Sequence, residues 1–250
     1  MSEKFRELEF SPSRTYVVGD IHGCNLELQS MLTFLEGTQK IGAEDLVVFI
    51  GDYIDRGPDS NGVVASLISF QKRHPQTIFL RGNHEDMFLE FLGFEGTEGM
   101  AYLKNGGAQC LQSYGLSGEA TSEEALASMP RDHLSFLLNT ERYVIADKYI
   151  YVHAGLDPLR DLRTQLDSSL FWIRDEFITN IHKFEKTVVF GHTPYRDVLF
   201  HLPYKIGIDT GLVYGNKLTC LELTGETVLQ VKKGSSEILV ATFAQKLAKL

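Results

Sequence analysis

The sequence predicts a mixed α/β fold in which β-sheet is flanked by helices. Short runs of β-branched and aromatic residues recur along the chain and, up to about residue 186, alternate with helical patterns. Beyond that point the strand-like runs follow one another directly, as in TVVFGH, KIGIDTG and KLTCLEL. The change of pattern indicates either one mixed sheet or two packed sheets, with helices on the outside.

Length and composition bound the class of protein. The chain has 250 residues, of which 43% are hydrophobic, so it can bury a core as one α/β domain or at most two. We expect a single domain over residues 1–250 with a helical insert at about 86–140. No stretch approaches the ~20 apolar residues of a membrane span. The opening MSEKFRELEF lacks the basic-then-apolar layout of a secretory signal.

Charge and cysteine content restrict the partners and the compartment. The formal net charge of −9 argues against a general nucleic-acid binder, which usually carries a basic face. A phosphorylated substrate stays possible, because metals and arginines reverse the charge of a site locally. Cys24, Cys110 and Cys220 are odd in number and widely spaced, as is typical of reduced thiols. We therefore expect a cytoplasmic protein without nucleic-acid or membrane partners, and its oligomeric state stays open.

The helices are predicted from apolar spacing and from signals at their ends. Residues 24–36 and 60–74 carry leucines, valines and isoleucines at helical spacing, and Pro75 ends the second of these helices. Within the insert, TSEE is typical of a capping box and Pro130 of a helix start. The tail 236–250 alternates apolar and basic residues, which we interpret as a packed helix.

Six predicted strands end in glycine next to polar residues. The strands TYVV, VVFI, TIFL, YIYV, TVVF and KIGI run into GDIHG, GDYIDRG, RGNHE, HAG, GHT and DTG, respectively. In open α/β sheets, ligands bind at the carboxyl ends of strands, and glycine lets the backbone approach closely. Burying the carboxylate of Asp52 behind VVFI is costly unless it is paired or bound to a metal. The pattern therefore predicts a buried cation.

The polar residues at these strand ends divide into two groups of metal ligands. Asp20 and His22 can face one ion, and the two oxygens of Asp52 can bridge to a second. The first group is Asp20, His22 and Asp52, and the second is Asp52, Asn83, His153 and His192. Nitrogen and oxygen ligands without thiolate favour Mn, Fe or Zn. Two metals ~3.5–4 Å apart are typical of in-line displacement at phosphorus, with attack by a bridging water whose pKa falls towards ~7.

The remaining charged residues of these motifs suit phosphoryl chemistry. His84 directly follows Asn83 and cannot easily bind the same ion, so it is free to donate a proton to the leaving oxygen. We expect Asp55 to hold the His84 ring and Arg56 to offer a planar fork to the phosphate. Arg174 in LFWIRDEF is a candidate for a second fork.

Taken in order, GDIHG, GDYIDRG, GNHE, HAG and GHT resemble the motifs of the phosphoprotein phosphatase branch of the calcineurin-like metallophosphoesterases. The resemblance spans roughly residues 15 to 223. It implies a β-sandwich with helices on both sides, a dinuclear centre and hydrolysis of phosphomonoesters. It also implies the two ligand groups above, with His84 as general acid, Asp55 as its partner, and Arg56, Arg174 and Asn83 on the substrate. Arg174 carries over less directly, because Arg160 and Arg163 lie nearby.

Three functional classes follow from these residues. YLKNGGAQCLQSYG and IDTGLVYGNKL resemble the small bacterial and phage protein phosphatases, which favours a manganese-dependent serine/threonine or broad-specificity phosphatase of proteins or small phosphoesters. The alternative is a symmetrical dinucleoside polyphosphate (diadenosine tetraphosphate) hydrolase, which typically reads GNHD where this chain has Glu85. A binding module without catalytic activity is disfavoured, because such a module does not need all of the predicted metal ligands and the general acid, and this chain has them all.

Two predictions concern the surroundings of the site. Asp209 either supports a ligand histidine or is only a turn residue, and the sequence leaves both open. Substrate specificity is expected from the 86–140 insert and from the rim near Tyr195 and Tyr214.

Overall fold

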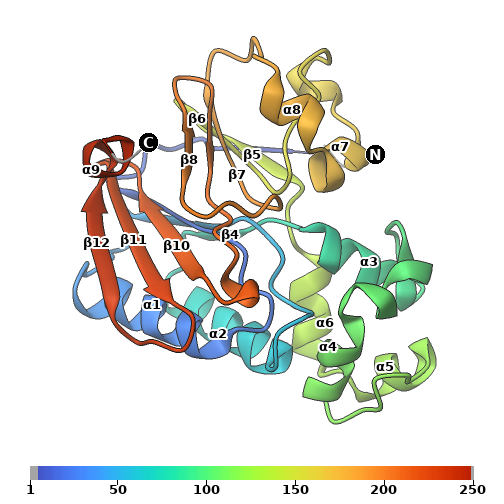
Figure 1. Ribbon diagram of the computed structural model, residues 1–250. Coiled ribbons are helices and arrows are strands. Elements are labelled where there is room, and N and C mark those ends of the chain that lie inside the picture. Colours follow the sequence, from blue (N-terminus) through green and yellow to red (C-terminus); the bar gives the residue numbers. More distant parts are fainter. Residues whose placement is uncertain (1–4, 249–250) are drawn as a thin grey trace.

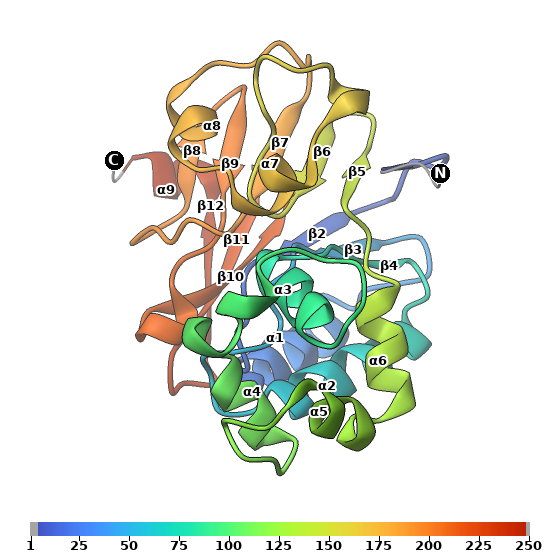
Figure 2. The ribbon, with the colours of Figure 1, turned by 90° about the vertical axis from the view of Figure 1, so that its right-hand side faces the viewer.

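The computed structural model describes residues 5–248. In it, two six-stranded mixed β-sheets pack face to face, and helices cover their outer faces (Figures 1 and 2). This architecture confirms the predicted α/β sandwich with helices on both sides. Of the two arrangements that the sequence left open, the chain adopts two packed sheets rather than one.

The lower sheet of Figure 1 contains the first three predicted strands. Its order is β12 (Ile238–Thr242), β11 (Thr227–Lys232), β10 (Lys217–Glu222), β2 (Thr15–Val18), β3 (Leu46–Phe49) and β4 (Thr77–Phe79). β2, β3 and β4 run parallel, with Phe49 opposite both Val18 and Phe79. Since these three residues stand in register at the strand ends, the loops that follow them leave the sheet at the same edge.

The upper sheet repeats this arrangement with the later predicted strands. Its order is β1 (Arg6–Glu7), β5 (Tyr143–Ile145), β6 (Tyr149–Val152), β7 (Thr187–Phe190), β9 (Lys205–Gly207) and β8 (Leu199–His201). β6, β7 and β9 run parallel, with Tyr151 opposite Val189 and Phe190 opposite Gly207. Each sheet therefore delivers three loops from the carboxyl ends of parallel strands.

Alternating side chains explain why the central strands read as continuous apolar runs. In β3, Val47 and Phe49 pack in the cluster that includes Leu28 and Leu67 of the helices below. Val48 points the other way and packs between the sheets with Val189 of the upper sheet. Because successive side chains of a strand face opposite sides, a strand covered on both faces needs apolar residues throughout.

The helices cover both outer faces and one side of the sandwich (Figure 1). α1 (Asn25–Gly37) and α2 (Ser60–Arg73) confirm the two predicted helices and lie on the lower sheet. α7 (Asp167–Trp172) and α8 (Asp175–Thr179) pack on the upper sheet, where Phe171 and Phe177 join its outer core. Within residues 5–248, every helix is too short or too polar to cross a membrane.

The predicted insert is helical and shares the core of the lower layer. Its helices are α3 (Asn83–Phe91), α4 (Gly107–Ser113), α5 (Ser122–Ser128) and α6 (Arg131–Leu138), with 3-10 turns at Gly99–Ala101 and Leu103–Asn105. Thr121 and Glu124 form the capping box that TSEE predicts. Leu111 and Leu137 pack in one cluster with Leu67 of α2. The insert is therefore packed against the sheet layer rather than set apart from it.

The prediction of a helix over the tail 236–250 is wrong for residues 238–242, and its last two residues, 249–250, lie outside the described part of the chain. Ile238–Thr242 forms β12, paired antiparallel with β11, and only Phe243–Leu247 is helical, as α9. The run ILVAT is rich in β-branched residues, and an adjacent strand was available to pair with it. Thr242 ends the strand and caps the helix, since its hydroxyl accepts from the backbone N–H of Gln245 at 3.1 Å.

Candidate active site

The six strand-end loops meet at one end of the sandwich and bring all six predicted metal ligands together. The backbone N–H of His22 donates to the carbonyl of Asp52 at 2.8 Å, which joins the loops after β2 and β3. The N–H of His84 donates to Asp52 Oδ1 at 3.1 Å, and that of His192 donates to Asp20 Oδ2 at 3.0 Å. The last contact connects the two sheets, so the site lies across their shared edge.

Gly51 shows why glycine stands at the end of β3. Its φ is +99°, in the left-handed region, and a Cβ there would lie 2.5 Å from the nitrogen of Gly82 and 2.9 Å from Nδ1 of His153. Any side chain would therefore push the loops after β3, β4 and β6 apart. The glycine allows the three loops to pack closely enough for their ligands to converge.

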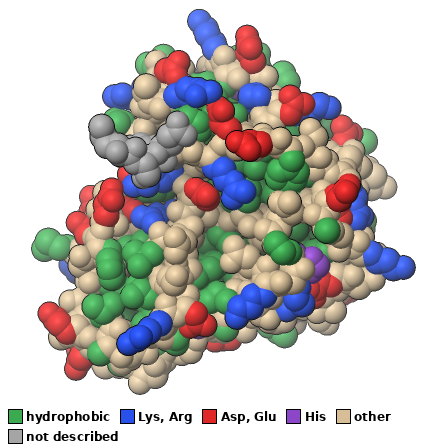
Figure 3. Space-filling view, turned by 180° about the vertical axis from the view of Figure 1, so that it is seen from behind, with side chains coloured by type: hydrophobic (Ala, Val, Ile, Leu, Met, Phe, Trp, Pro, Cys, Tyr) green, Lys and Arg blue, Asp and Glu red, His purple; other side chains and the backbone are tan. Residues whose placement is uncertain are grey.

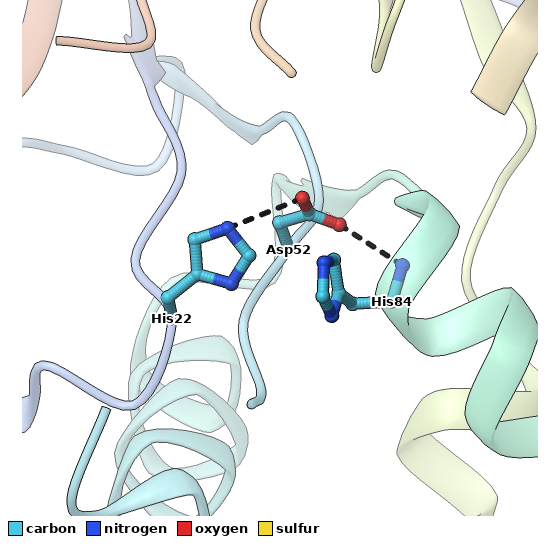
Figure 4. A group of neighbouring side chains, drawn as sticks. All are labelled: His22, Asp52 and His84. Atoms are coloured by element: carbon cyan, nitrogen blue, oxygen red, sulfur yellow. Dashed lines mark hydrogen bonds and ion pairs between the residues drawn. The ribbon is translucent and has the colours of Figure 1, made fainter. Parts of the chain in front are cut away.

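Asp52 lies at the centre of the site, between two histidines that come from different sheets. Its Oδ2 is 3.3 Å from Nε2 of His22, and its Oδ1 is 3.5 Å from Nε2 of His153. Figure 4 shows its carboxylate between the His22 ring and the backbone nitrogen of His84 at the start of α3. One carboxylate thus faces both predicted ligand groups.

The tautomers of these two histidines direct lone pairs at Asp52. Nδ1 of His22 lies 3.0 Å from the carbonyl of Ile54, and Nδ1 of His153 lies 2.9 Å from that of Ile50. A carbonyl oxygen only accepts, so each Nδ1 carries the proton and each neutral ring presents an unprotonated Nε2. Each Nε2 then faces a carboxylate oxygen, which is also an acceptor. Two acceptors held face to face on both sides of Asp52 fit a cation at each position.

The other ligands show the same surplus of acceptors. Oδ1 of Asn83 is 3.1 Å from Nε2 of His153 and 3.0 Å from Nδ1 of His192. Oδ1 of Asp20 and Nε2 of His192 are buried without a hydrogen-bond partner. Unpartnered buried polar atoms are rare in folded proteins, and a missing ion is one of their explanations. Atoms of His22, Asp52 and His84 that are able to bind a metal lie within 4.8 Å of one another, as do those of Asp52, His153 and His192.

Burial keeps the imidazoles of the site in the form that binds metals. It lowers the pKa of His22 to about 3, and burial together with His153 lowers the pKa of His192 to about 2. Burial and the nearby Asp209 and Asp52 carboxylates raise the pKa of Asp20 well above its usual value. Neutral imidazoles coordinate metals, and a buried carboxylate that resists ionisation gains from a cation beside it.

His84 and Asp55 form a buried pair beside the ligands. Nδ1 of His84 lies 2.7 Å from Oδ2 of Asp55, and both side chains are fully buried. Nε2 of His84 is buried without a partner. Burial opposes protonation, but the carboxylates of Asp52 and Asp55 outweigh it and raise the pKa of His84 above its usual value. The geometry suits a histidine held at one nitrogen and open at the other.

Two of the arginines singled out in the sequence, Arg56 and Arg174, contact histidines of the site. Nη1 of Arg56 is 2.7 Å from Nε2 of His22, and Nη1 of Arg174 donates to the carbonyl of His192 at 3.2 Å. Arg160 pairs with Asp157 at 3.3 Å, and Arg163 pairs with Glu7. Of the three arginines in that part of the chain, Arg174 is therefore the one that borders the site.

Comparison with known proteins agrees with this geometry. The calcineurin-like phosphoesterase family matches residues 13–220. The chain belongs to this family. The predicted family is thereby confirmed, and the phosphoesterase is a metal-dependent hydrolase.

The relatives of this calcineurin-like phosphoesterase divide between two activities. It is 30% identical over 210 residues to serine/threonine-protein phosphatase 1 of Salmonella typhimurium, covering 82% of this chain and 89% of that protein. It is 27% identical over 231 residues to the asymmetrical bis(5'-nucleosyl)-tetraphosphatase of Oceanobacillus iheyensis, covering 81% and 86%. A solved structure of a protein proposed to be a diadenosine tetraphosphatase has a TM-score of 0.69 at 24% identity, covering 92% and 98%.

Glu85 ties two loops of the phosphoesterase together, a role that the sequence did not reveal. Its carboxylate accepts from the backbone N–H groups of Gly82 at 2.9 Å and of Asp52 and Tyr53 at 2.8 Å each. Glutamate three residues into a helix is the only signal that pointed to it, as half of a capping box. Asp209 accepts from the N–H of Gly211 at 2.9 Å, so its turn role is present. Burial raises the pKa of Asp209 to about 6, and its carboxylate contributes to the raised pKa of Asp20.

We expect Glu85→Gln to destabilise the phosphoesterase by about 2–4 kcal/mol and to weaken metal binding. Glutamine replaces one accepting oxygen by an NH2 group that faces backbone N–H donors, so the loop that holds Asp52 loses its anchor. Thermal unfolding and metal titration check this outcome. The matched control is Glu119→Gln on the exposed loop after α4. Equal stability of the two variants would show that the Glu85 carboxylate does not hold the two loops together.

Proposed function

We propose that this phosphoesterase is a phosphomonoesterase that removes phosphoryl groups from phosphoserine and phosphothreonine in proteins, with tolerance for other phosphoesters. The observation that carries this proposal is the position of Asp52, whose two oxygens face the unprotonated Nε2 atoms of His22 and His153 at 3.3 and 3.5 Å. An arrangement with ligands on both sides of one carboxylate suits a dinuclear centre for phosphoryl transfer.

The ligands assigned to the two ions are those expected from the sequence. Asp20, His22 and Asp52 are proposed to hold one ion, and Asp52, Asn83, His153 and His192 the other. Two divalent cations, when bound there, supply a water of lowered pKa as the nucleophile and neutralise charge on the phosphoryl group. Manganese is the proposed native metal, with Fe or Zn as alternatives, because imidazole and carboxylate ligands without thiolate suit these ions. Magnesium dehydrates reluctantly and is less suited to imidazole.

The other residues of the site handle the proton and the phosphate. His84 holds a proton at Nε2 for the leaving oxygen, while Asp55 binds Nδ1 and fixes the ring. Arg56 and Arg174 offer guanidinium groups to the phosphoryl oxygens, and the amide of Asn83 is proposed to contact substrate as well. The two guanidinium groups would thereby neutralise the negative charge of the bound phosphate from two sides of the site.

A groove beside Arg56 is the proposed place for the rest of the substrate. It has a volume of about 410 Å³ and is lined by Arg56, Lys104, Asn105, Gly106, Gln109, Val213 and Tyr214. Lys104, Gln109 and Tyr214 are exposed, and the Arg56 guanidinium lies 5.7 Å from the centre of the Tyr214 ring. The groove joins the insert to the rim near Tyr214, the two regions expected to determine specificity.

The second candidate function is dinucleoside tetraphosphate hydrolysis, because a relative with that activity matches at 27% identity. A competition assay separates the two candidates: kcat/KM is measured for phosphoserine peptide, phosphotyrosine peptide and diadenosine tetraphosphate on one manganese-loaded preparation. Protein phosphatase activity requires the highest value on a phosphopeptide. Much faster cleavage of diadenosine tetraphosphate would replace the first proposal by the second.

The proposed partners are phosphorylated proteins or small phosphoesters, rather than nucleic acid or membrane. A single domain is proposed to bind and hydrolyse them. Figure 3 shows acidic and basic side chains interspersed with neutral and hydrophobic ones over the face seen from behind. This mixture, with the net charge of −9, gives no support to a nucleic-acid surface. Cys24, Cys110 and Cys220 are buried free thiols, which supports the proposal of a reducing, cytoplasmic environment.

Arg56→Ala is expected to lower kcat/KM by about 10–100-fold on every substrate with a terminal phosphate, since charged hydrogen bonds contribute ~1.5–3 kcal/mol each. Arg56→Lys keeps the charge but loses the planar fork, so it is expected to recover only part of the loss. Arg163→Ala, at the surface beside Glu7, is the control. Equal kcat/KM for Arg56→Ala and Arg163→Ala would remove Arg56 from the phosphate site.

A further inference from the structure

Tyr102 of the insert is hydrogen-bonded to the partner of the proposed general acid. Its hydroxyl donates to Oδ1 of Asp55 at 3.0 Å, while Oδ2 of the same carboxylate lies 2.7 Å from Nδ1 of His84. Each of the three side chains is 0% exposed. Tyr102, Asp55 and His84 therefore form a continuous buried chain that ends at Nε2 of His84, the unpartnered nitrogen.

Asp55 needs both of these hydrogen bonds to keep one orientation. Within residues 5–248, the hydrogen bonds to its carboxylate come from His84 and Tyr102, one to each oxygen. A buried carboxylate oxygen without a donor costs free energy, so a bare Oδ1 would favour rotation of the carboxylate away from His84. The backbone of Asp55 is itself in the left-handed region, with φ of +71°.

Tyr102 is positioned rigidly enough to provide that restraint. Its ring lies 4.9 Å from the ring of Phe88 and 5.0 Å from that of Phe91, both on α3. A few residues on, the carbonyl of Gly106 accepts from the backbone N–H of Arg56 at 3.0 Å. A Cβ at Gly106 would lie 2.6 Å from Cγ of Arg56, so glycine permits this contact. One segment of the insert thus contacts both Asp55 and Arg56.

We infer that Tyr102 is a positioning residue for the Asp55–His84 pair and that the insert thereby takes part in acid catalysis. This inference rests on the proposed role of His84 as proton donor. The Tyr102 hydroxyl holds Oδ1, which aims Oδ2 at Nδ1 of His84. The His84 ring then presents Nε2, with its proton, to the leaving oxygen. No proton passes through Tyr102, which acts only by orientation.

The test compares two Tyr→Phe substitutions that each remove one buried hydroxyl. Tyr102→Phe keeps the ring between Phe88 and Phe91, whereas Tyr143→Phe removes a hydroxyl that donates to the carbonyl of Leu162 at 2.6 Å. Loss of a supporting residue typically costs about 10–100-fold. We expect Tyr102→Phe to lower kcat by that factor on a phosphoserine peptide and by less than ~3-fold on p-nitrophenyl phosphate, whose leaving group needs little protonation. KM and metal content are expected to stay unchanged, and Tyr143→Phe to match the wild type.

A spectroscopic readout tests the orientation without turnover. In zinc-loaded protein, the ring N–H proton of a histidine bound to a carboxylate gives a low-field NMR signal, and His84→Asn assigns the signal of His84. We expect this signal to shift or broaden in Tyr102→Phe, to vanish in Asp55→Asn and to be unchanged in Tyr143→Phe. In addition, Tyr102→Phe combined with Asp55→Asn is expected to resemble Asp55→Asn alone, because both act through one contact.

The outcomes separate this inference from the proposed function. If His84→Asn and Asp55→Asn show the dependence on leaving group while Tyr102→Phe matches Tyr143→Phe in kcat and in the His84 signal, the inference is overturned and the proposed acid stands. If His84→Asn itself shows no dependence on leaving group, the acid role and the inference fail together. Additive losses in the Tyr102→Phe, Asp55→Asn double variant would also overturn the inference.

Discussion

Asp52→Asn is expected to weaken the binding of both metal ions and to reduce activity by more than ~100-fold, since even residues that only support ligands cost 10–100-fold. The substitution removes the negative charge that faces His22 on one side and His153 on the other. Asparagine retains one oxygen, so the hydrogen bond from the backbone of His84 at 3.1 Å can persist and the fold is expected to survive. Metal analysis of purified protein, together with thermal unfolding, measures the result.

The control for this substitution is Asp147→Asn, in the exposed turn between β5 and β6. It makes the same chemical change outside the site, so metal content and activity should equal those of the wild type. Retention of two tightly bound ions by Asp52→Asn would rule out the bridging role. Loss of one ion with retention of the other would assign Asp52 to a single ligand group.

His84→Asn is expected to keep both ions and to lose on the order of 10²–10⁴ in kcat on phosphoserine peptides. The loss should be much smaller on p-nitrophenyl phosphate, because nitrophenolate leaves readily without a proton whereas a serine alkoxide is strongly basic. His84 also lies within 4.8 Å of the ligating atoms of His22 and Asp52, so metal analysis must accompany the kinetics. A variant that lacks one ion would identify His84 as a ligand instead of the acid.

Asp55 provides an internal check on the same prediction. On this assignment Asp55 acts only through its 2.7 Å contact with Nδ1 of His84, so Asp55→Asn should cost less than His84→Asn. The double variant should resemble His84→Asn, because residues that act as one unit are not additive. Equal losses on both substrates would instead indicate that His84 steadies the phosphate, and additive losses would give Asp55 a separate function.

Much of the ligand set was predictable because it is encoded locally. Asp20, Asp52 and His153 each follow directly after a strand or its closing glycine, and the parallel register places those strand ends at shared edges. A polar residue in that position is unusual enough to be noticed in the sequence. Strand-end position and ligand chemistry grouped residues of both edges in one site but left one or two sheets open. The 3.0 Å hydrogen bond from the backbone N–H of His192 to Asp20 shows that the edges of two different sheets are joined.

The tail shows where local pattern misleads. Residues 238–242 read ILVAT, a run rich in β-branched residues, and they pair antiparallel with β11. Secondary-structure propensity is weak compared with a ladder of backbone hydrogen bonds to an existing sheet. The prediction failed because it considered the segment without its neighbour.

The sequence by itself determined the fold class, the strand-end ligands and the kind of chemistry, because strand period, glycine and polar residue lie within a few positions of one another. Only the tertiary structure decided which side chains complete the site. Tyr102 reaches Asp55 across 47 positions, and Glu85 reaches Tyr53 across 32. Such contacts depend on how the insert packs on the lower sheet and on the direction in which each buried polar group finds its partner. Periodicity specifies the face of an element, but it carries no information about the distant group that a side chain on that face will meet.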